Sequence, residues 1–461
     1  MVEGRIPSSF RDPSGFLFKE KGVLYRQIND SFREEYDFFE ESGLKDDLIQ
    51  SGLLIAHTNV SDKFQKTDEA YKIIKPEPLD FISYPFEWCF SQLKDAALTT
   101  LTIQKKALEY DMSLKDASAY NIQFFHGKPV FIDTLSFERY QEGEPWIAYN
   151  QFCQHFLAPL ALMSFRDLRL SQMLRVFIEG IPLEIASSLL PTRSYLNLGV
   201  TLHVHFHSRS RKRYLGGGID SSRAKKKFSK NSFLGLINSL ESVIKKLECK
   251  IDDSAWVDYY RDDSYSETAF EHKKKILEGC IKKINPKTVW DLGANTGVFS
   301  RIAGKKGAST VSFDSDPAVV EKNYVECKRE GETEILPLVL DFTNPTSNIG
   351  WSCKERMSII GRGPCDLALA LALVHHLSIA NNVPFKMVSE FLGEICKSLI
   401  IEFIPKEDPK VQILLSSRKD IFTEYNQQSF EKEFKKVFKI QYAEKISDSE
   451  RTIYLMEKKR M

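Results

Sequence analysis

TVWDLGANTGVFS, residues Thr288 to Ser300, decides the fold of the second half of this chain. An apolar strand leads directly into a turn of small residues, and a helix is expected to follow. Gly293 and Gly297 have no side chain to keep a ligand from the backbone, and Asn295 is one of the few other residues that tolerate a positive φ. Amides at the start of a helix lack partners within it, so we expect those after this turn to face a ligand. The pattern predicts a nucleotide-binding site.

The next strand indicates which nucleotide. It spans Thr310 to Phe313 and ends at Asp314, whose carboxylate could accept hydrogen bonds from both hydroxyls of a ribose. The glycines follow Asp291 as Gly-x-Asn-x-Gly instead of GxGxxG, and no phosphate-binding lysine motif is near. The stretch resembles the first motif of class I S-adenosylmethionine-dependent methyltransferases, an acid followed by Gly-x-Gly-x-Gly, with Asn295 in place of the middle glycine.

The resemblance continues to the last residues of the chain. Three apolar runs indicate buried strands of a parallel sheet, an amphipathic helix lies between the last two, and two polar-flanked segments indicate a closing antiparallel hairpin. These are the strands Pro337 to Asp341, Cys365 to His376 and Ser398 to Phe403, the helix Phe385 to Cys396, and the hairpin strands Val437 to Ala443 and Arg451 to Glu457. The family's fold is α/β, with a doubly wound, Rossmann-like sheet of seven strands.

The resemblance also implies a set of residues that bind S-adenosylmethionine. In the family, the first motif binds the methionine and ribose portion of the cofactor. The acid that ends the second strand binds the ribose hydroxyls, and the residues that end the third strand bind the adenine. In this chain those are Asp291, Gly293, Asn295 and Gly297, then Asp314, and then Asp341 with Phe342.

Candidate catalytic residues end the fourth and fifth strands. His375 and His376 stand where the family binds its acceptor, and a neutral imidazole could remove a hydroxyl or amine proton. Because side chains alternate along a strand, at most one of the two is expected to be the base, and the alternative is packing beneath the cofactor. Glu402 is a further candidate. Glu407 and Asp408 either contact a hydroxyl-rich acceptor or lie exposed.

The acceptor itself is less specified. There is no Asn-Pro-Pro-aromatic motif for bases, and Cys365 lies before its strand, which argues against a cysteine nucleophile. The segments LALVHHL and EFIPKEDP look like those of bacterial methyltransferases labelled as nodulation-related, which implies a small-molecule or glycan acceptor. An RNA or protein methyltransferase and a non-catalytic adenosylmethionine-binding module stay open as alternatives.

The amino-terminal half, 1–207, is expected to be a separate α+β domain. A helix from Ser91 to Tyr110 precedes a hairpin, and around that hairpin Asp116, Asn121 and Asp133 have the spacing of a phosphotransferase catalytic loop and its metal-binding aspartate. This half therefore resembles the protein-kinase and aminoglycoside-kinase fold.

The match to that fold is incomplete. Leu114 stands where the family has a histidine, and Thr134 and Leu135 follow the last aspartate in place of a glycine. We find neither a glycine-rich phosphate loop nor the strand lysine, so a non-phosphorylating scaffold is expected. A bifunctional kinase and methyltransferase, and an unrelated substrate-binding or partner-binding domain, are the alternatives. The aromatic residues between Trp146 and Phe156 recur at helical spacing, and we assign them to packing.

Between the halves, Ser208 to Lys230 contains nine basic residues, one acid and three consecutive glycines. It predicts a flexible linker, 208–232, with nucleic-acid contact through 209–230 as the less favoured reading. Before it, His203, His205 and His207 alternate, which would put them on one face of a strand. With no acidic or cysteine partner evident, we expect an ordinary sheet face and no metal. The methyltransferase domain is then 233–461, and 233–282, which includes Trp256, resembles a lid helix.

Composition limits the remaining possibilities. The chain has 461 residues, enough for two or three domains, and its 64 basic and 63 acidic side chains leave a net charge of +1. General attraction to nucleic acid or membrane is therefore not expected. The eight cysteines form no CxxC pair, no secretory signal is evident, and no apolar run approaches the roughly 20 residues that span a bilayer. These features predict a soluble cytoplasmic protein.

Overall fold

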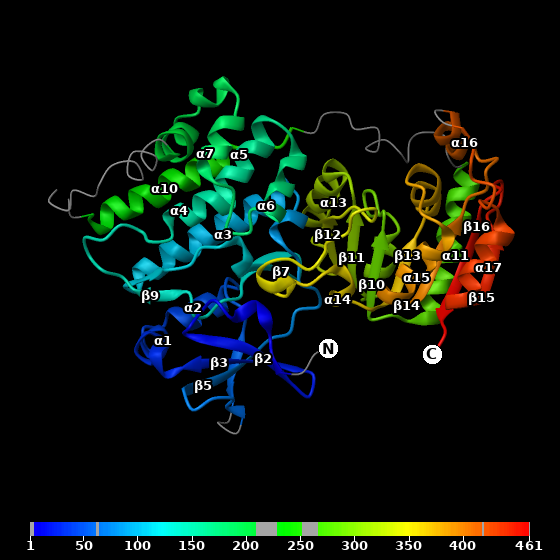
Figure 1. The fold of residues 1–461 in the computed structure, drawn as a ribbon. Helices are drawn as coiled ribbons and strands as arrows, with labels where there is room; N and C mark the ends of the chain where they lie inside the picture. The colour runs from blue at the N-terminus through cyan, green and yellow to red at the C-terminus, as the bar shows by residue number, and fades with distance from the viewer. Residues whose placement is uncertain (1–3, 61–63, 209–227, 251–265, 417–418, 461) are drawn as a thin grey trace. The chain divides into compact units, whose positions relative to one another are not determined.

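The computed structural model describes residues 4–60, 64–208, 228–250, 266–416 and 419–460. The chain divides into two compact units (Figure 1). The first comprises Met1–Lys250 together with Gly350–Arg356, and the second comprises Ile251–Ile349 and Met357–Met461. No helix in the described ranges combines the length and the apolar character that crossing a bilayer requires.

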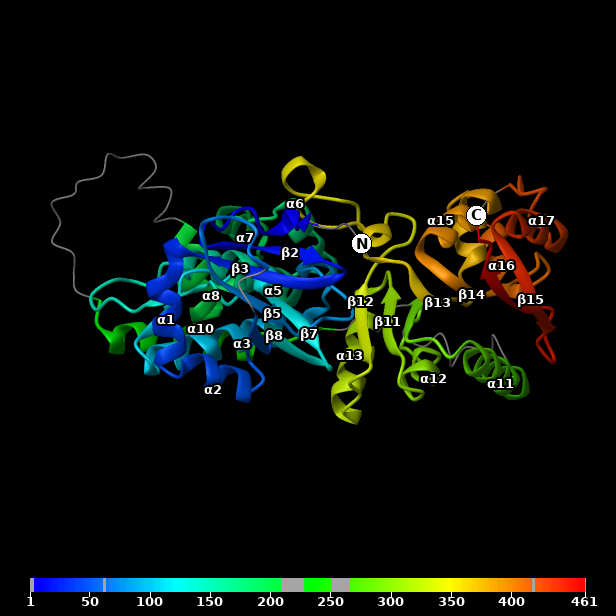
Figure 2. The same cartoon turned by 90° about the horizontal axis from the view of Figure 1, so that it is seen from below.

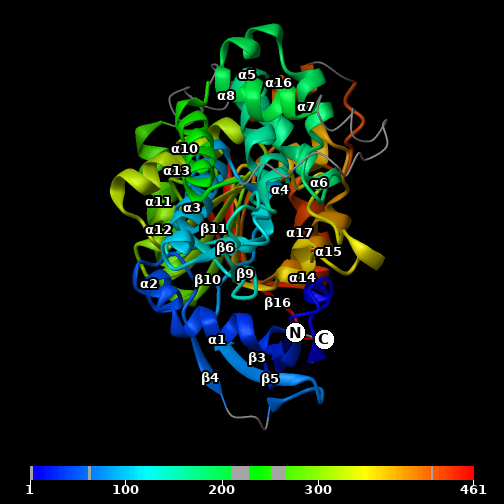
Figure 3. The same cartoon turned by 90° about the vertical axis from the view of Figure 1, so that its left-hand side faces the viewer.

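The first unit begins with an antiparallel sheet of five strands in the order β1-β2-β3-β5-β4. Its aromatic and branched side chains, among them Phe18 and Ile73, form a separate small core. Figure 3 shows strands β3, β4 and β5 with helix α1 beside them. The elements are β1 (Gly4–Arg5), β2 (Gly15–Glu20), β3 (Val23–Asn29), α1 (Arg33–Glu41), α2 (Leu44–Gln50), β4 (His57–Val60) and β5 (Ala70–Pro76).

The middle of the first unit is organised around helix α3 (Phe90–Glu109). Two antiparallel pairs follow it, β6 (Met112–Leu114) with β9 (Phe137–Arg139), and β7 (Ile122–Phe125) with β8 (Lys128–Phe131). The β7–β8 turn has positive φ at His126 and Gly127. The expected helix and hairpin are therefore confirmed.

Helices complete the first unit. Trp146, Phe152 and Phe156 are buried among them, as expected of a packing stripe. They include α4 (Tyr149–Phe152), α5 (Ala158–Phe165), α6 (Met173–Val176), α7 (Leu183–Leu189), α8 (Leu198–Val200) and α10 (Lys230–Lys246), with the π-helices η6 (Cys153–Leu157) and η9 (Thr201–Phe206) and the 3-10 helices η7 (Leu168–Gln172) and η8 (Thr192–Leu196).

The expected strand through the three alternating histidines is wrong. Residues 198–208 are helical, and η9 contains His203 and His205. Val200 and Val204, four residues apart, are buried, which is the period of a helix. The two-residue spacing of the histidines matches the period of a strand, but the segment is helical.

The domain boundary also differs from the expectation. Helix α10 was expected in a lid over the methyltransferase domain, yet it packs against α3 and belongs to the first unit. Its buried side chains, such as Phe233, Ile237 and Leu240, recur at three and four residues and supply the apolar face for that packing. The boundary therefore lies after Lys250, and not within 208–232.

The second unit contains one mixed sheet of seven strands in the order β12-β11-β10-β13-β14-β16-β15. The first five positions pair in parallel, and the hairpin β15–β16 joins β14 antiparallel. This is the sheet expected from the sequence. Its strands are β10 (Thr288–Leu292), β11 (Ser309–Asp314), β12 (Ile335–Val339), β13 (Cys365–Ala370), β14 (Cys396–Phe403), β15 (Phe438–Lys445) and β16 (Thr452–Lys458).

Helices cover both faces of this sheet (Figure 2). Helices α11, α12 and α13 lie on one face, and α15 and α17 lie on the other. Ile276, Leu277 and Ile281 of α11 belong to the core, so α11 is a packed layer and not a free lid. The helices are α11 (Glu267–Ile284), α12 (Ser300–Gly304), α13 (Pro317–Glu330), α14 (Ile359–Arg362), α15 (Phe385–Ile395), α16 (Pro409–Ser416) and α17 (Gln427–Val437).

Candidate functional site

The turn after β10 has the backbone that its residues predict. Gly293, Asn295 and Gly297 have φ of 82°, 51° and 79°. The amides of this turn nevertheless bond within the protein: Gly293 N and Ala294 N both donate to the carbonyl of Phe313. These two amides of the turn are therefore not available to a ligand, whereas the expectation for the amides at the start of α12 (Ser300–Gly304) stays a prediction.

Asp314, at the end of β11, is joined to that turn. Its Oδ2 accepts from Asn295 N at 2.8 Å, and its Oδ1 accepts from Asp316 N at 3.0 Å. Burial raises the pKa of this carboxyl to about 6, although the two backbone amides lower it. Each oxygen has a further lone pair, so the carboxylate can accept from a ligand while it holds the turn.

Asp291 has a different environment. Its side chain is 1 % exposed, and its Oδ2 accepts from Ser300 Oγ at 2.6 Å. Ser300 Oγ also lies 2.8 Å from Ser312 Oγ, which accepts from Asn323 Nδ2 at 3.0 Å. Burial raises the pKa of Asp291 to about 7, opposed by the Ser300 bond and Lys273. Asp291 therefore ties β10 to helix α12 below the turn.

Gly297 is required by close packing. A Cβ there would lie 2.6 Å from the side-chain amide of Asn323 and 2.8 Å from Arg301 Nη1. Gly293 has more room, since the nearest atom to its Cβ would be a methyl of Leu373 at 3.6 Å. Of the two glycines, Gly293 leaves space near the backbone, and Gly297 lets α12 approach α13.

Asp341 and Phe342 follow β12 at the same edge of the sheet. Asp341 is exposed, and its Oδ1 accepts from the amide and the hydroxyl of Thr343, both at 2.7 Å. The ring of Phe342 is half-buried and meets Phe313 edge to face at 5.7 Å. The Leu340 amide donates to the carbonyl of Asp314 at 2.8 Å, which joins this loop to the end of β11.

The expectation that His375 and His376 end a strand is wrong. Strand β13 ends at Ala370, and both histidines lie in the helical turn that follows. Their rings are 4.1 Å apart, so they are neighbours and do not alternate across a sheet. Burial lowers the pKa of both, and His376, Arg451 and Lys273 lower that of His375 further.

The two rings differ in access. His375 is 1 % exposed, and its Nδ1 is buried with no hydrogen-bond partner in the described part of the chain. His376 is half-buried. Both imidazoles are neutral at neutral pH, and of the two His376 is the one that an acceptor could reach.

Glu402 is part of a buried ion network. It is 0 % exposed, and its Oε2 accepts from Lys273 Nζ at 2.7 Å and from Ala372 N at 2.9 Å. Arg451 Nη1 lies 3.8 Å from Oε1 of Glu402, while Arg451 Nε and Nη2 donate to Oδ2 and Oδ1 of Asp408 at 2.7 and 3.1 Å. Glu402 therefore balances two buried cations. Its expected catalytic role does not fit these contacts.

The two acids that follow β14, Glu407 and Asp408, have different environments. Asp408 is 8 % exposed and paired with Arg451, so neither sequence-based reading, acceptor contact or exposure, describes it. Glu407 is exposed. Asp408 joins the loop after β14 to the start of β16.

Ala372 and Lys273 are site residues that sequence reasoning missed. Ala372 has a φ of 50°, a left-handed conformation that a non-glycine residue adopts at a cost, and the bond to Glu402 holds it. Burial lowers the pKa of the Lys273 ammonium, while Glu402 raises it. No local sequence motif identifies either residue, since the role of each depends on its contact with Glu402, which is distant in the sequence.

In the first unit, the three residues of the expected phosphotransferase motif do come together. Asn121 Nδ2 donates to Ser136 Oγ, which donates in turn to Asp133 Oδ2. Asp116 Oδ1 accepts from the Ser118 amide, and burial raises its pKa.

The acid at the expected metal-binding position is already paired. Asp133 Oδ1 accepts from Arg26 Nη1, a side chain of β3. Burial alone would raise the pKa of Asp133, but Arg26 and Ser136 hold it below its usual value. A guanidinium thus occupies one oxygen that a divalent cation would use.

The histidines of η9 have ordinary partners. His203 Nδ1 bonds Tyr149 Oη, and His205 Nε2 bonds Ser194 Oγ, both at 2.8 Å. Burial lowers the pKa of His203 to about 4. Within the described residues, no group of three or more histidine, cysteine or acidic side chains could hold a metal ion. Trp256 of the expected lid lies outside the described residues.

Comparisons with known proteins identify the family. No family model matches the chain. The nodulation protein NoeA of Rhizobium meliloti strain 1021 is 32 % identical over 462 residues, which is 99 % of this chain and 96 % of NoeA. The chain belongs to the NoeA family.

Solved structures resemble this NoeA-family chain only over part of its length. The bifunctional kinase-methyltransferase WbdD has a TM-score of 0.29 and 18 % identity, with 43 % of this chain and 41 % of WbdD covered. Magnesium protoporphyrin IX methyltransferase ChlM of Synechocystis PCC 6803, solved with bound SAH, has a TM-score of 0.32 and 13 % identity, with 44 % of this chain and 92 % of ChlM covered.

Proposed function

We propose that the second unit is a class I S-adenosylmethionine-dependent methyltransferase. The observation that carries the proposal is the carboxylate of Asp314, fixed beside the Gly293–Asn295 turn at the carboxyl ends of parallel strands. Ligands of open α/β sheets bind at that edge, and an acid there accepts the ribose hydroxyls. NoeA-family membership is consistent with the proposal, which goes beyond it.

The chain's residues divide into those that would hold the cofactor and those that support them. Asp314 would bind the ribose, and Asp341 with the face of Phe342 would bind the adenine. Asn295 shapes the turn beside Gly293, and the cofactor, when bound, supplies an electrophilic methyl group. Asp291 and Gly297 fix the strand and helix that carry this turn.

For the acceptor, we propose a small molecule or a glycan. The proposal rests on relationship to a nodulation protein and on the two histidines beside β13. A half-buried neutral imidazole suits removal of one proton from a hydroxyl or amine. We propose His376 as that base, with His375 packed behind it.

The first test is calorimetry on the full chain with S-adenosylmethionine and with S-adenosylhomocysteine. We expect saturable binding of both, and methyl transfer to a component of a metabolite extract, detected by mass spectrometry as an added methyl mass. Absence of heat with either compound would contradict the assignment. Binding without transfer to any extract would favour a non-catalytic binding module.

Cofactor affinity should depend on pH through Asp314. Its pKa of about 6 means that the carboxylate is ionised at neutral pH and protonated below. Only the ionised form accepts from both ribose hydroxyls, so protons compete with the ligand. We expect constant affinity above roughly pH 7 and a loss approaching about tenfold per pH unit below roughly pH 6. Calorimetry between about pH 5 and pH 8 measures it, and a flat profile would contradict ribose binding by an Asp314 carboxyl with a raised pKa.

Replacement of His376 by asparagine should lower kcat about a hundredfold, the usual contribution of a general base. Cofactor affinity should change little, because the ring is proposed to act on the acceptor. His375→Asn is the matched control, for which we expect little effect on kcat. Unchanged turnover in both variants would remove the proposal of a histidine base.

For the first unit, we propose a kinase-like scaffold without phosphotransfer. A five-stranded sheet followed by α3 and the Asp116–Asn121–Asp133 group supports the kinase-like reading. The Arg26–Asp133 ion pair supports inactivity, because it neutralises the acid on which metal binding would depend.

The scaffold should accordingly show no magnesium-dependent ATP hydrolysis above background and no thermal stabilisation by Mg-ATP. Both are measured on the full chain, with Asp133→Asn as the control for contaminating activity. ATP hydrolysis that disappears in Asp133→Asn would favour the bifunctional alternative.

A further inference from the structure

An exposed apolar stripe runs along one side of the helical segment 198–208 in the first unit. Leu198 is 83 % exposed, Leu202 52 % and Phe206 49 %. These residues are four apart, so they line one side of the segment, and Leu196, just before it, is 86 % exposed. Exposed apolar patches of this kind mark interaction sites more often than isolated side chains do.

The opposite side of the same segment packs against the rest of the first unit. Val200 and Val204 are buried, and His203 and His205 bond to neighbouring hydroxyls. Packing within the first unit therefore accounts for the buried side of the segment, while Leu198, Leu202 and Phe206 keep much of their surface exposed.

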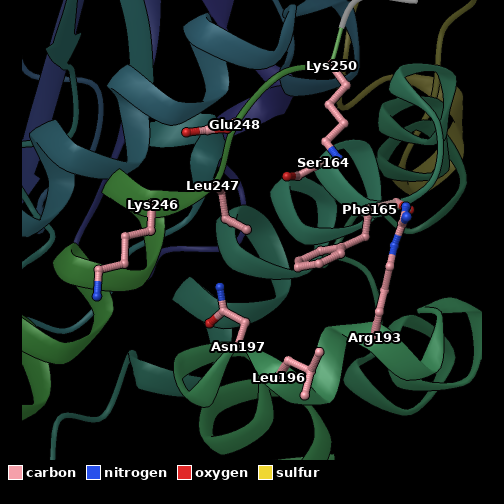
Figure 4. A pocket seen from close by; sticks show the side chains of 9 residues that line it. All are labelled: Ser164, Phe165, Arg193, Leu196, Asn197, Lys246, Leu247, Glu248 and Lys250. Carbon is pink, nitrogen blue, oxygen red and sulfur yellow. The ribbon is translucent and has the colours of Figure 1, made fainter.

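At the Leu196 end of the stripe, basic side chains outnumber acidic ones. Residues 185–207 contain one arginine and no acid. A pocket of about 320 Å³ lies next to Leu196 and is lined by Arg193, Lys246 and Lys250, with Glu248 as its one acid (Figure 4). Arg193 Nη2 donates to the Phe165 carbonyl at 2.9 Å, which fixes its side chain at the rim.

Two cations of this pocket, Lys246 and Lys250, are not held in close ion pairs with described residues. Among the described residues, no carboxylate lies within ion-pair distance of Lys246 or Lys250, whereas the adjacent Lys245 pairs with Glu241 at 2.7 Å. In Figure 4, the Lys250 side chain is directed towards Ser164. The pocket thus combines cationic groups and hydroxyl or amide groups with an apolar rim.

We propose that this surface, the lipid-contact face formed by Leu196, Leu198, Leu202, Phe206 and the three cations, binds the surface of an anionic lipid bilayer. Apolar side chains of an interfacial helix enter the boundary between headgroups and acyl chains, while lysine and arginine contact lipid phosphates. The near-zero net charge of the chain does not oppose this, because the attraction is local.

Other occupants fit less well. In a twofold contact between two copies, the same patch meets itself, so the three cations of both copies would be brought together in one interface. Nucleic acid would engage the cations but leave the apolar stripe in water. A bilayer satisfies both kinds of side chain at once.

The test is sedimentation of the full chain with vesicles of phosphatidylcholine alone and with vesicles containing an equal part of phosphatidylglycerol. We expect binding to the anionic vesicles and little to the neutral ones, weakened by added salt. The variant Leu198→Ser/Leu202→Ser should lose binding about tenfold or more, and Lys246→Gln/Lys250→Gln should also lose binding. Because these side chains are exposed, the fold should survive, as thermal unfolding will check.

Ile413→Ser, an equally exposed apolar residue of the second unit, is the matched control and should bind as the parent does. Absence of binding to anionic vesicles would overturn the proposal, as would equal binding by the stripe variant. Light scattering that shows a dimer abolished by Leu198→Ser/Leu202→Ser, with no vesicle binding, would assign the stripe to self-association instead.

Discussion

Replacement of Asp314 by alanine is expected to weaken the binding of S-adenosylmethionine at least about a hundredfold. Two hydrogen bonds from ribose hydroxyls to a carboxylate are lost, and a bond from a neutral donor to a charged acceptor contributes about 1.5–3 kcal/mol. The change also removes the acceptor for Asn295 N, so the turn beside Gly293 loses its tie to β11. Both effects act in the same direction.

Calorimetry with S-adenosylhomocysteine measures this loss without interference from turnover. Asp366→Asn is the control, since Asp366 begins β13 at the opposite edge of the same sheet and bonds the amides of Lys287 and Thr288. We expect the control to bind within a fewfold of the parent. Equal loss in both variants would mean that the effect is one of stability and not of ligand contact.

Replacement of Glu402 by glutamine is expected to destabilise the second unit by about 3–5 kcal/mol. The carboxylate balances Lys273 and, with Asp408, Arg451, all nearly excluded from water. A neutral amide leaves the Lys273 ammonium buried without an opposite charge next to it, and removing one partner of a buried pair costs more than the pair contributes.

Hydrogen exchange of the β14 amides reports this loss, because it measures opening of the second unit separately from the first. The double variant Lys273→Met/Glu402→Gln should be less destabilised than the sum of the single variants, since it removes the unpaired cation. Asp420→Asn, which breaks the exposed pair with Lys406, should have little effect on stability. A similar cost for Asp420→Asn and Glu402→Gln would contradict the buried network.

The sequence predicted most of the sheet because its strands are apolar runs bounded by small or charged residues. It failed where such a run continues into a helix. CDLALALALVHH is apolar to its end, and hydrophobicity alone does not distinguish the strand to Ala370 from the helical turn that contains His375. The alternation of three histidines likewise predicted a strand where the chain is helical. His203 and His205 are buried because each has a hydrogen-bonding side-chain partner, and not because they share one face of a strand.

The roles of the acids could be predicted only in part. Asp314 and Asp341 follow strands at one edge, and the order of elements is enough to bring them there. Glu402 has the same sequence context, but its bond to Lys273 spans 129 residues, and that pairing has no local signal. A carboxylate at a strand end is therefore a site residue only if no buried cation reaches it first.

The Lys273–Glu402 bond limits how the second unit could move. The buried ammonium of Lys273 links helix α11 to the central sheet. Moving α11 outward would separate this ammonium from the Glu402 carboxylate and leave each charge unpaired in an apolar interior. A rearrangement that opens the second unit would therefore have to occur elsewhere and leave α11 in place.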